Sequence, residues 1–82
     1  MKGHKALKAL LQGKRIRHER WARSSYVWLG CNKMNDKIIY AEGFSSFNTV
    51  RMLRGGPHVE LNGYGKDELM SRLLEDGWEV VE

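Results

Sequence analysis

The chain has 82 residues, of which 41% are apolar and 29% charged, and its net charge is +4. This length allows one domain with a modest core, and the composition excludes a disordered chain. It holds no apolar run long enough for a membrane span or a signal peptide, and its single cysteine excludes an internal disulfide. We therefore expect a cytoplasmic protein with no membrane partner, one that gains stability from self-association.

The charge is distributed unevenly along the chain. Residues 1–23 carry eight Lys and Arg side chains against Glu19 alone, whereas residues 60–82 carry seven acids against Lys66 and Arg72. Complementary ends of this kind favour pairing with each other, either within one fold or between subunits. The basic remainder favours an anionic ligand, and nucleic acid is the less favoured partner because the tail is acidic.

The first half of the chain has a clear pattern. Residues 3–12 carry apolar side chains at helical spacing and precede Gly13, which suits a left-handed cap, so a helix is predicted. Residues 14–18 alternate in polarity and predict a short strand with Arg15 and Arg17 on one face. A β-hairpin follows, formed by an aromatic and β-branched strand, a turn and a return strand, at residues 25–31, 32–36 and 37–41.

The second half is less regular. In residues 42–56, Phe47, Val50 and Leu53 share one helical face closed by Gly55, and both a helix and an ordered loop remain open. A strand, a helix and a closing strand are then expected, at residues 58–62, 67–76 and 78–81. The fold class is therefore α+β: one domain, residues 1–82, with an antiparallel sheet of about four to five strands, an N-terminal helix and a C-terminal helix.

Four arginines and three aromatic side chains lie close together in residues 15–28. A guanidinium offers paired donors to a phosphate, and an aromatic ring stacks on a base. The candidate ligand-binding residues are Arg17, Arg20, Trp21, Arg23, Tyr26 and Trp28. Structural alternatives remain: Trp21 packs on the first helix and Arg17 is solvated on the sheet, while Tyr26 and Trp28 lie in the core or at a subunit interface.

Catalytic and metal chemistry find little support in the sequence. The three histidines, His4, His18 and His58, have no metal-ligand spacing with one another or with Cys31. Cys31 is better explained as a buried strand cysteine than as a nucleophile. We therefore expect a protein that is not an enzyme, with no catalytic residues, no metal and no cofactor.

Both ends of the chain also carry a recognisable pattern. At the N-terminus, helical residues 6–10 are followed by Gly13-Lys14, Ile16-Arg17 and Trp21; at the C-terminus, Ser71 and Leu73-Leu74 precede residues 78–81. These patterns resemble the second type of Thoeris anti-defence proteins, a family of small, mostly phage-encoded proteins. The likeness covers roughly half the chain, and residues 32–56 have no matching motif.

The resemblance implies an anti-defence sponge. Such a protein binds and sequesters a cyclic nucleotide immune signal, a cyclic ADP-ribose isomer or a cyclic dinucleotide, without catalysis. It also implies a homo-oligomer with ligand pockets between subunits, and it assigns Arg17 to a phosphate and Trp21 to the pocket wall. Two alternatives stand beside it: a small basic nucleic-acid-binding module, and a protein-interaction inhibitor of a host defence protein.

Overall fold

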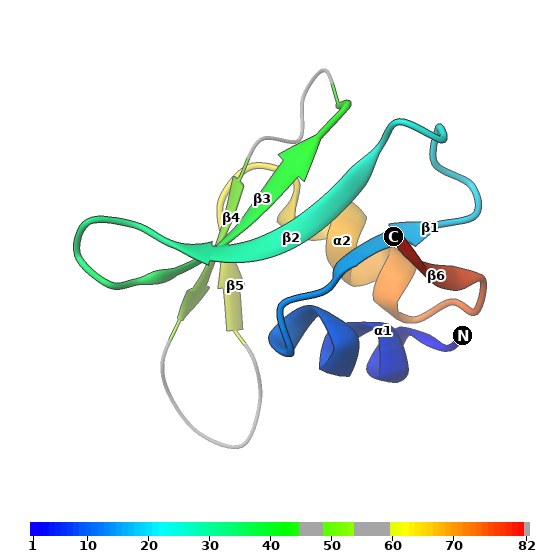
Figure 1. Ribbon diagram of the computed structural model, residues 1–82, viewed down its shortest axis with the longest axis horizontal. Coiled ribbons are helices and arrows are strands. Elements are labelled where there is room, and N and C mark those ends of the chain that lie inside the picture. Colours follow the sequence, from blue (N-terminus) through cyan, green and yellow to red (C-terminus); the bar gives the residue numbers. More distant parts are fainter. Residues whose placement is uncertain (45–48, 54–59, 82) are drawn as a thin grey trace.

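The computed structural model describes residues 1–44, 49–53 and 60–81. Two helices and six strands follow one another along these residues (Figure 1). In chain order they are α1 (Gly3–Leu11), β1 (Arg15–His18), β2 (Tyr26–Cys31), β3 (Lys37–Glu42), β4 (Thr49–Leu53), β5 (Glu60–Asn62), α2 (Lys66–Leu73) and β6 (Trp78–Val81).

The strands form one antiparallel sheet in the order β5-β4-β3-β2-β1-β6. The expected α+β class, with a helix near each end, is confirmed, but the sheet has six strands rather than four or five. The additional strand is β4, in the segment for which only a helix or a loop was considered. Val50 lies opposite Ile39 of β3 and is fully buried, and Met52, two residues on, also packs against the core, as strand alternation requires. Phe47, the first residue of the helical face considered for this segment, lies outside the described residues.

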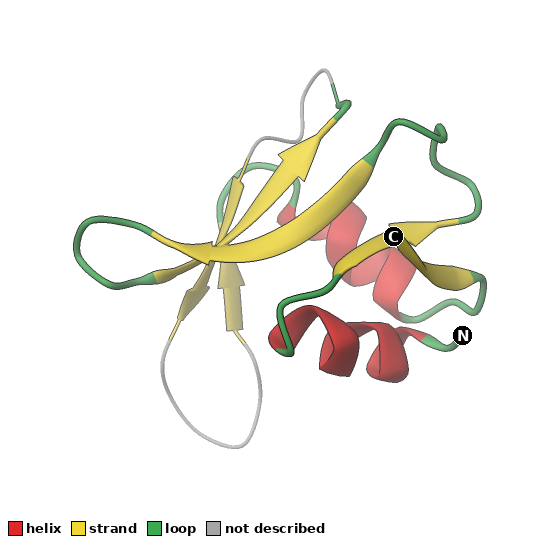
Figure 2. Ribbon diagram, viewed as in Figure 1, coloured by secondary structure: helices red, strands yellow, loops and turns green. Residues whose placement is uncertain are grey.

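The core lies between the helices and one face of the sheet. Figure 2 shows both helices on the same side of the twisted sheet. The buried apolar residues come from both helices and from five strands: Ala6, Ala9, Leu10, Ile16, Val27, Ile39, Val50, Leu69 and Trp78, with Leu61 of β5 packed against them. At the end of α1, Gly13 has a φ of 89° and the Lys14 N–H donates to the Ala9 carbonyl, which confirms the predicted glycine cap.

The basic and acidic ends of the chain meet within the fold. Strand β1 lies between β2 and β6, so the first strand pairs with the last along its whole length. Arg17 forms an ion pair with Glu79 across this pair of strands. The expected pairing of complementary ends is therefore intramolecular. Within the described ranges, no helix has the length and apolar character needed to cross a bilayer.

Candidate functional site

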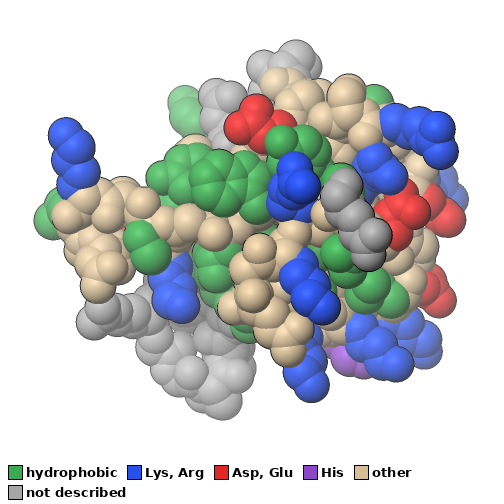
Figure 3. Space-filling model, in the orientation of Figure 1, with side chains coloured by type: hydrophobic (Ala, Val, Ile, Leu, Met, Phe, Trp, Pro, Cys, Tyr) green, Lys and Arg blue, Asp and Glu red, His purple; other side chains and the backbone are tan. Residues whose placement is uncertain are grey.

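The face of the sheet opposite the helices is not covered by any helix of the described part of the chain. We call it the outer face. Figure 3 views this side and shows hydrophobic side chains gathered over β2 and β3, with Lys and Arg side chains beside them. By strand alternation and register, its described members are Arg15, Arg17, Tyr26, Trp28, Gly30, Ile38, Tyr40, Glu42, Thr49, Arg51, Asn62, Glu79 and Val81.

An aromatic pair occupies the middle of the outer face. Trp28 and Tyr40 are directly opposite each other on β2 and β3, and their rings stack with centroids 4.6 Å apart and planes inclined by 22°. Gly30 provides the room for this pair. A Cβ at that position would lie only 2.9 Å from a Tyr40 ring carbon and 3.0 Å from a Trp28 ring carbon. Both rings are half-buried, so part of each remains accessible.

The three arginines of the outer face have different partners. The Arg17 Nε donates to Glu79 at 2.8 Å, and its Nη1 donates to the Arg23 carbonyl. Arg51 forms an ion pair with Asp36 at 3.2 Å. The Arg15 guanidinium instead lies over the Tyr26 ring, 5.4 Å from the centroid, and forms no ion pair with any described residue. Among the described arginines of this face, Arg15 is therefore the one that an anion reaches without displacing an acid.

The predicted site residues do not all converge. Arg17, Tyr26 and Trp28 share the outer face, but Trp21 lies on the other side of the sheet. Its ring meets Trp78 and Phe44 edge-on, with both centroid distances 5.0 Å. Trp21 thus packs against the core beside α2, so the structural alternative describes its position better than a shared pocket with Arg17.

The remaining predicted cations have exposed side chains. Arg20 and Arg23 lie in the segment between β1 and β2, and Arg23 contributes its carbonyl to Arg17. The Arg20 N–H donates to His18 Nδ1 at 3.2 Å. Neither side chain makes an ion pair with a described residue. In the described part of the chain, the cation–π contact with an aromatic ring of the outer face is made by Arg15 and by neither of these two arginines.

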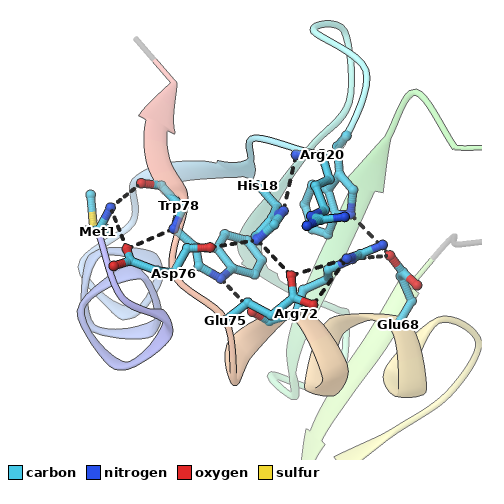
Figure 4. A network of polar contacts seen from close by, with 10 residues as sticks. Met1, His18, Arg20, Glu68, Arg72, Glu75, Asp76 and Trp78 are labelled. Atoms are coloured by element: carbon cyan, nitrogen blue, oxygen red, sulfur yellow. Dashed lines mark hydrogen bonds and ion pairs between the residues drawn. The ribbon is translucent and has the colours of Figure 1, made fainter.

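A polar network ties α2 to β1 and β6 on the opposite side of the sheet (Figure 4). The Arg72 Nε donates to Glu68 and its Nη1 donates to Glu75. The Trp78 Nε1 donates to the Arg72 carbonyl at 2.8 Å. His18 is fully buried, with its Nε2 at 2.9 Å from the Asp76 carbonyl. The network fixes the end of α2 against the sheet.

The hydrogen bonds of His18 define its tautomer. Because Nδ1 accepts from the Arg20 N–H, the proton of the neutral ring is on Nε2, which donates to the Asp76 carbonyl and faces Glu75 at 3.2 Å. Both ring nitrogens are therefore engaged, and the ring packs edge-on against Trp78 at 5.2 Å. A buried imidazole bound in this way acts in folding and has no free nitrogen for a ligand.

Glu68 makes the stability of this corner dependent on pH. The hydrogen bond from Arg72 holds the pKa of the Glu68 carboxyl below its usual value of 4.5, and the Trp21 indole N–H adds to the effect. A lowered pKa in the folded state stabilises the protein above the unfolded pKa, and this contribution is lost as the pH falls through the folded value.

We predict that Glu68→Gln lowers the free energy of unfolding at neutral pH by at most about 1 kcal/mol, because the carboxylate is partly solvated. Urea unfolding of both proteins between neutral pH and pH of about 3 checks this. The difference between them should shrink below pH of about 4.5. A constant difference over the whole range would contradict an electrostatic origin.

Other groups give no defined site. A hollow of about 430 Å³ lies between the start of α1 and the end of α2, and its lining mixes the cation Lys2 with the acids Glu75 and Asp76. Among the described residues, no cluster of three or more His, Cys, Asp or Glu side chains is arranged to hold a metal. Cys31 is exposed at the end of β2, so the expectation of a buried cysteine was wrong.

The sequence analysis missed two groups of the outer face, Arg15 and Tyr40. Strand alternation already placed Arg15 beside Arg17, but the family pattern drew attention to Arg17 alone. Tyr40 follows from the hairpin, since a turn at residues 32–36 puts position 31 opposite 37 and hence Trp28 opposite Tyr40, as observed.

Comparison with known proteins leaves the geometry as the main guide to function. No protein-family model matches the chain, and searches of curated proteins and of solved structures found no significant similarity.

Proposed function

We propose that this protein binds and sequesters a cyclic nucleotide, a cyclic ADP-ribose isomer or a cyclic dinucleotide, on its outer face and without catalysis. The observation that carries the proposal is the half-buried Trp28–Tyr40 stack, with Arg15 next to Trp28 in the strand register and its guanidinium over the neighbouring Tyr26 ring. A ligand with a planar base and a phosphate meets both requirements of such a face, since aromatic rings stack on bases and guanidinium groups bind phosphates.

The resemblance of the chain's two ends to the second type of Thoeris anti-defence proteins supports the sponge function. In this proposal the protein is a cytoplasmic homo-oligomer, and a second copy closes the open face over the ligand to form a pocket between subunits. Cys31, exposed and unpaired, fits a reducing compartment. Trp21 and Arg17 support the fold here, and Trp28 replaces Trp21 as the stacking residue.

We expect Trp28→Ala to weaken binding of the cognate nucleotide by about 1–3 kcal/mol, the usual value of one base–aromatic stack. Isothermal titration with cyclic ADP-ribose, cyclic di-AMP and cyclic GMP-AMP identifies the ligand and measures the loss. Tyr64→Ala is the matched control, because Tyr64 is an exposed aromatic residue outside the outer face. If the native protein, freed of any co-purified ligand, binds no member of the panel, the proposal fails.

A second candidate is a module for single-stranded nucleic acid, because exposed aromatic residues on an open sheet are a common way to stack unpaired bases. The charges of the outer face weigh against it, since Arg17 and Arg51 are paired with acids and Glu42 is exposed nearby. This candidate predicts that the protein binds single-stranded oligonucleotides. The logarithm of the binding constant should then fall with the logarithm of the salt concentration, with a slope of about −0.7 for each phosphate contacted.

A further inference from the structure

The cations of the outer face are not equivalent, and the difference bears on which ligand group each one meets. Continuing the antiparallel register from Ile16 opposite Val27 places Arg15 beside Trp28 and Arg17 beside Tyr26. Across the sheet, one row therefore runs Val81, Arg15, Trp28, Tyr40, Thr49, and the next runs Glu79, Arg17, Tyr26, Glu42. The first row carries one cation and no acid, whereas the second ends in an acid on both sides.

Arg15 is held in place before a ligand arrives. Its guanidinium lies over the ring of Tyr26, diagonally across β1 and β2, and this cation–π contact leaves the edge donors of the guanidinium free. A side chain that already rests on a ring loses less rotamer entropy on binding an anion than a side chain surrounded only by solvent. Arg17, by comparison, already donates to the Glu79 carboxylate and to the Arg23 carbonyl.

We propose that Arg15, held on Tyr26, is the residue that selects for phosphate, and that the ligand is a compact nucleotide with its base near Trp28 and one phosphate at Arg15. This inference rests on the proposed function and names the group that the bound nucleotide must carry. Glu42 and Glu79 flank the neighbouring row, so a chain of several phosphates extending along it meets carboxylates at both ends. The face therefore favours a ligand with few charges over a polyanion.

The decisive experiment compares a nucleotide with its phosphate-free nucleoside. Titrations of cyclic di-AMP and of adenosine are performed with the native protein, Arg15→Gln, Arg15→Lys and Trp28→Ala. Arg15→Gln should lower the affinity for cyclic di-AMP about ten- to hundredfold, which is the usual effect of losing hydrogen bonds to a charged group. The affinity for adenosine, which has no phosphate, should not change. Arg15→Lys should restore part of the affinity, because a lysine keeps the charge but lacks the planar fork.

Two matched controls separate this role from a general loss of charge or of fold. Lys5→Gln removes an exposed cation from α1, on the helix side of the sheet, and should bind as the native protein does. Arg17→Gln breaks the ion pair with Glu79 and should lower the thermal midpoint more than Arg15→Gln does. Unfolding curves of every variant accompany the titrations.

The outcomes distinguish the two proposals. If neither cyclic di-AMP nor the other cyclic nucleotides bind the native protein, the proposed function itself fails. If they bind, and Trp28→Ala weakens them while Arg15→Gln does not, the role of Arg15 is wrong and the function stands. If Arg15→Gln lowers the affinity for adenosine and for cyclic di-AMP equally, Arg15 is a structural residue. If Arg15→Gln changes the oligomeric state of the protein without ligand, Arg15 is an interface residue.

Discussion

Gly3→Ala should lower the free energy of unfolding by about 3 kcal/mol, the upper part of the usual range for overpacking a tightly packed site. Gly3 is buried at the start of α1, where this helix crosses the end of α2. A Cβ there would lie 1.7 Å from the Leu73 carbonyl oxygen and 2.5 Å from the carbonyl carbon. These atoms belong to the backbone and cannot rotate away, so the two helices would have to separate.

Helix propensity predicts the opposite sign. Alanine is better than glycine inside a helix by about 1 kcal/mol, so a reader of the sequence would expect Gly3→Ala to stabilise α1. Urea unfolding decides between the two. Gly13→Ala serves as the matched control, because a Cβ at that position meets nothing within 4 Å. The expected loss of stability there is about 1–2 kcal/mol and comes only from the left-handed backbone, with its φ of 89°. A Gly3→Ala protein as stable as the native one would contradict the close helix crossing.

The elements with strong local signals were predictable from the sequence. The hairpin expected at residues 25–31 and 37–41 is present as β2 and β3, because aromatic and β-branched residues flank a turn in which Asn32 accepts two backbone N–H groups. The second helix ends at Leu73 rather than at the expected residue 76. Trp78 and His18 donate to the carbonyls of Arg72 and Asp76 there, and such distant partners are not visible in a local pattern.

The candidate site was only partly predictable, for a reason that Arg17 and Trp21 illustrate. They are four residues apart, and a shared motif suggests that they act together. The strand ends at His18, and a turn in which the Trp21 N–H donates to the His18 carbonyl carries the indole to the helix side. Proximity along the chain therefore did not become proximity in space. Alternation and hairpin register, which depend on backbone geometry alone, would have identified Arg15 and Tyr40.

The three tryptophans occupy three different environments, and their replacement by alanine should separate stability from binding. Trp78 is 2% exposed and contacts His18 and Trp21 edge-on, so Trp78→Ala should cost about 3–5 kcal/mol, the usual loss for a buried aromatic residue. That is a large fraction of the 5–15 kcal/mol by which a typical domain is stable. We expect this variant to be partly unfolded at physiological temperature.

Trp21→Ala should have an intermediate effect on stability, because its ring is only half-buried and one side of it covers the core. Trp28→Ala should cost about 1 kcal/mol or less, the value of a cross-strand aromatic pair, since no core residue depends on it. Denaturant unfolding measures the loss of stability in the three variants, and nucleotide titration of those that fold measures the loss of affinity. Trp28→Ala should be the one of the three variants that lowers nucleotide affinity more than stability. If Trp21→Ala lowers the affinity as much as Trp28→Ala or more, the ligand binds on the side of the sheet that bears α2 and not on the outer face.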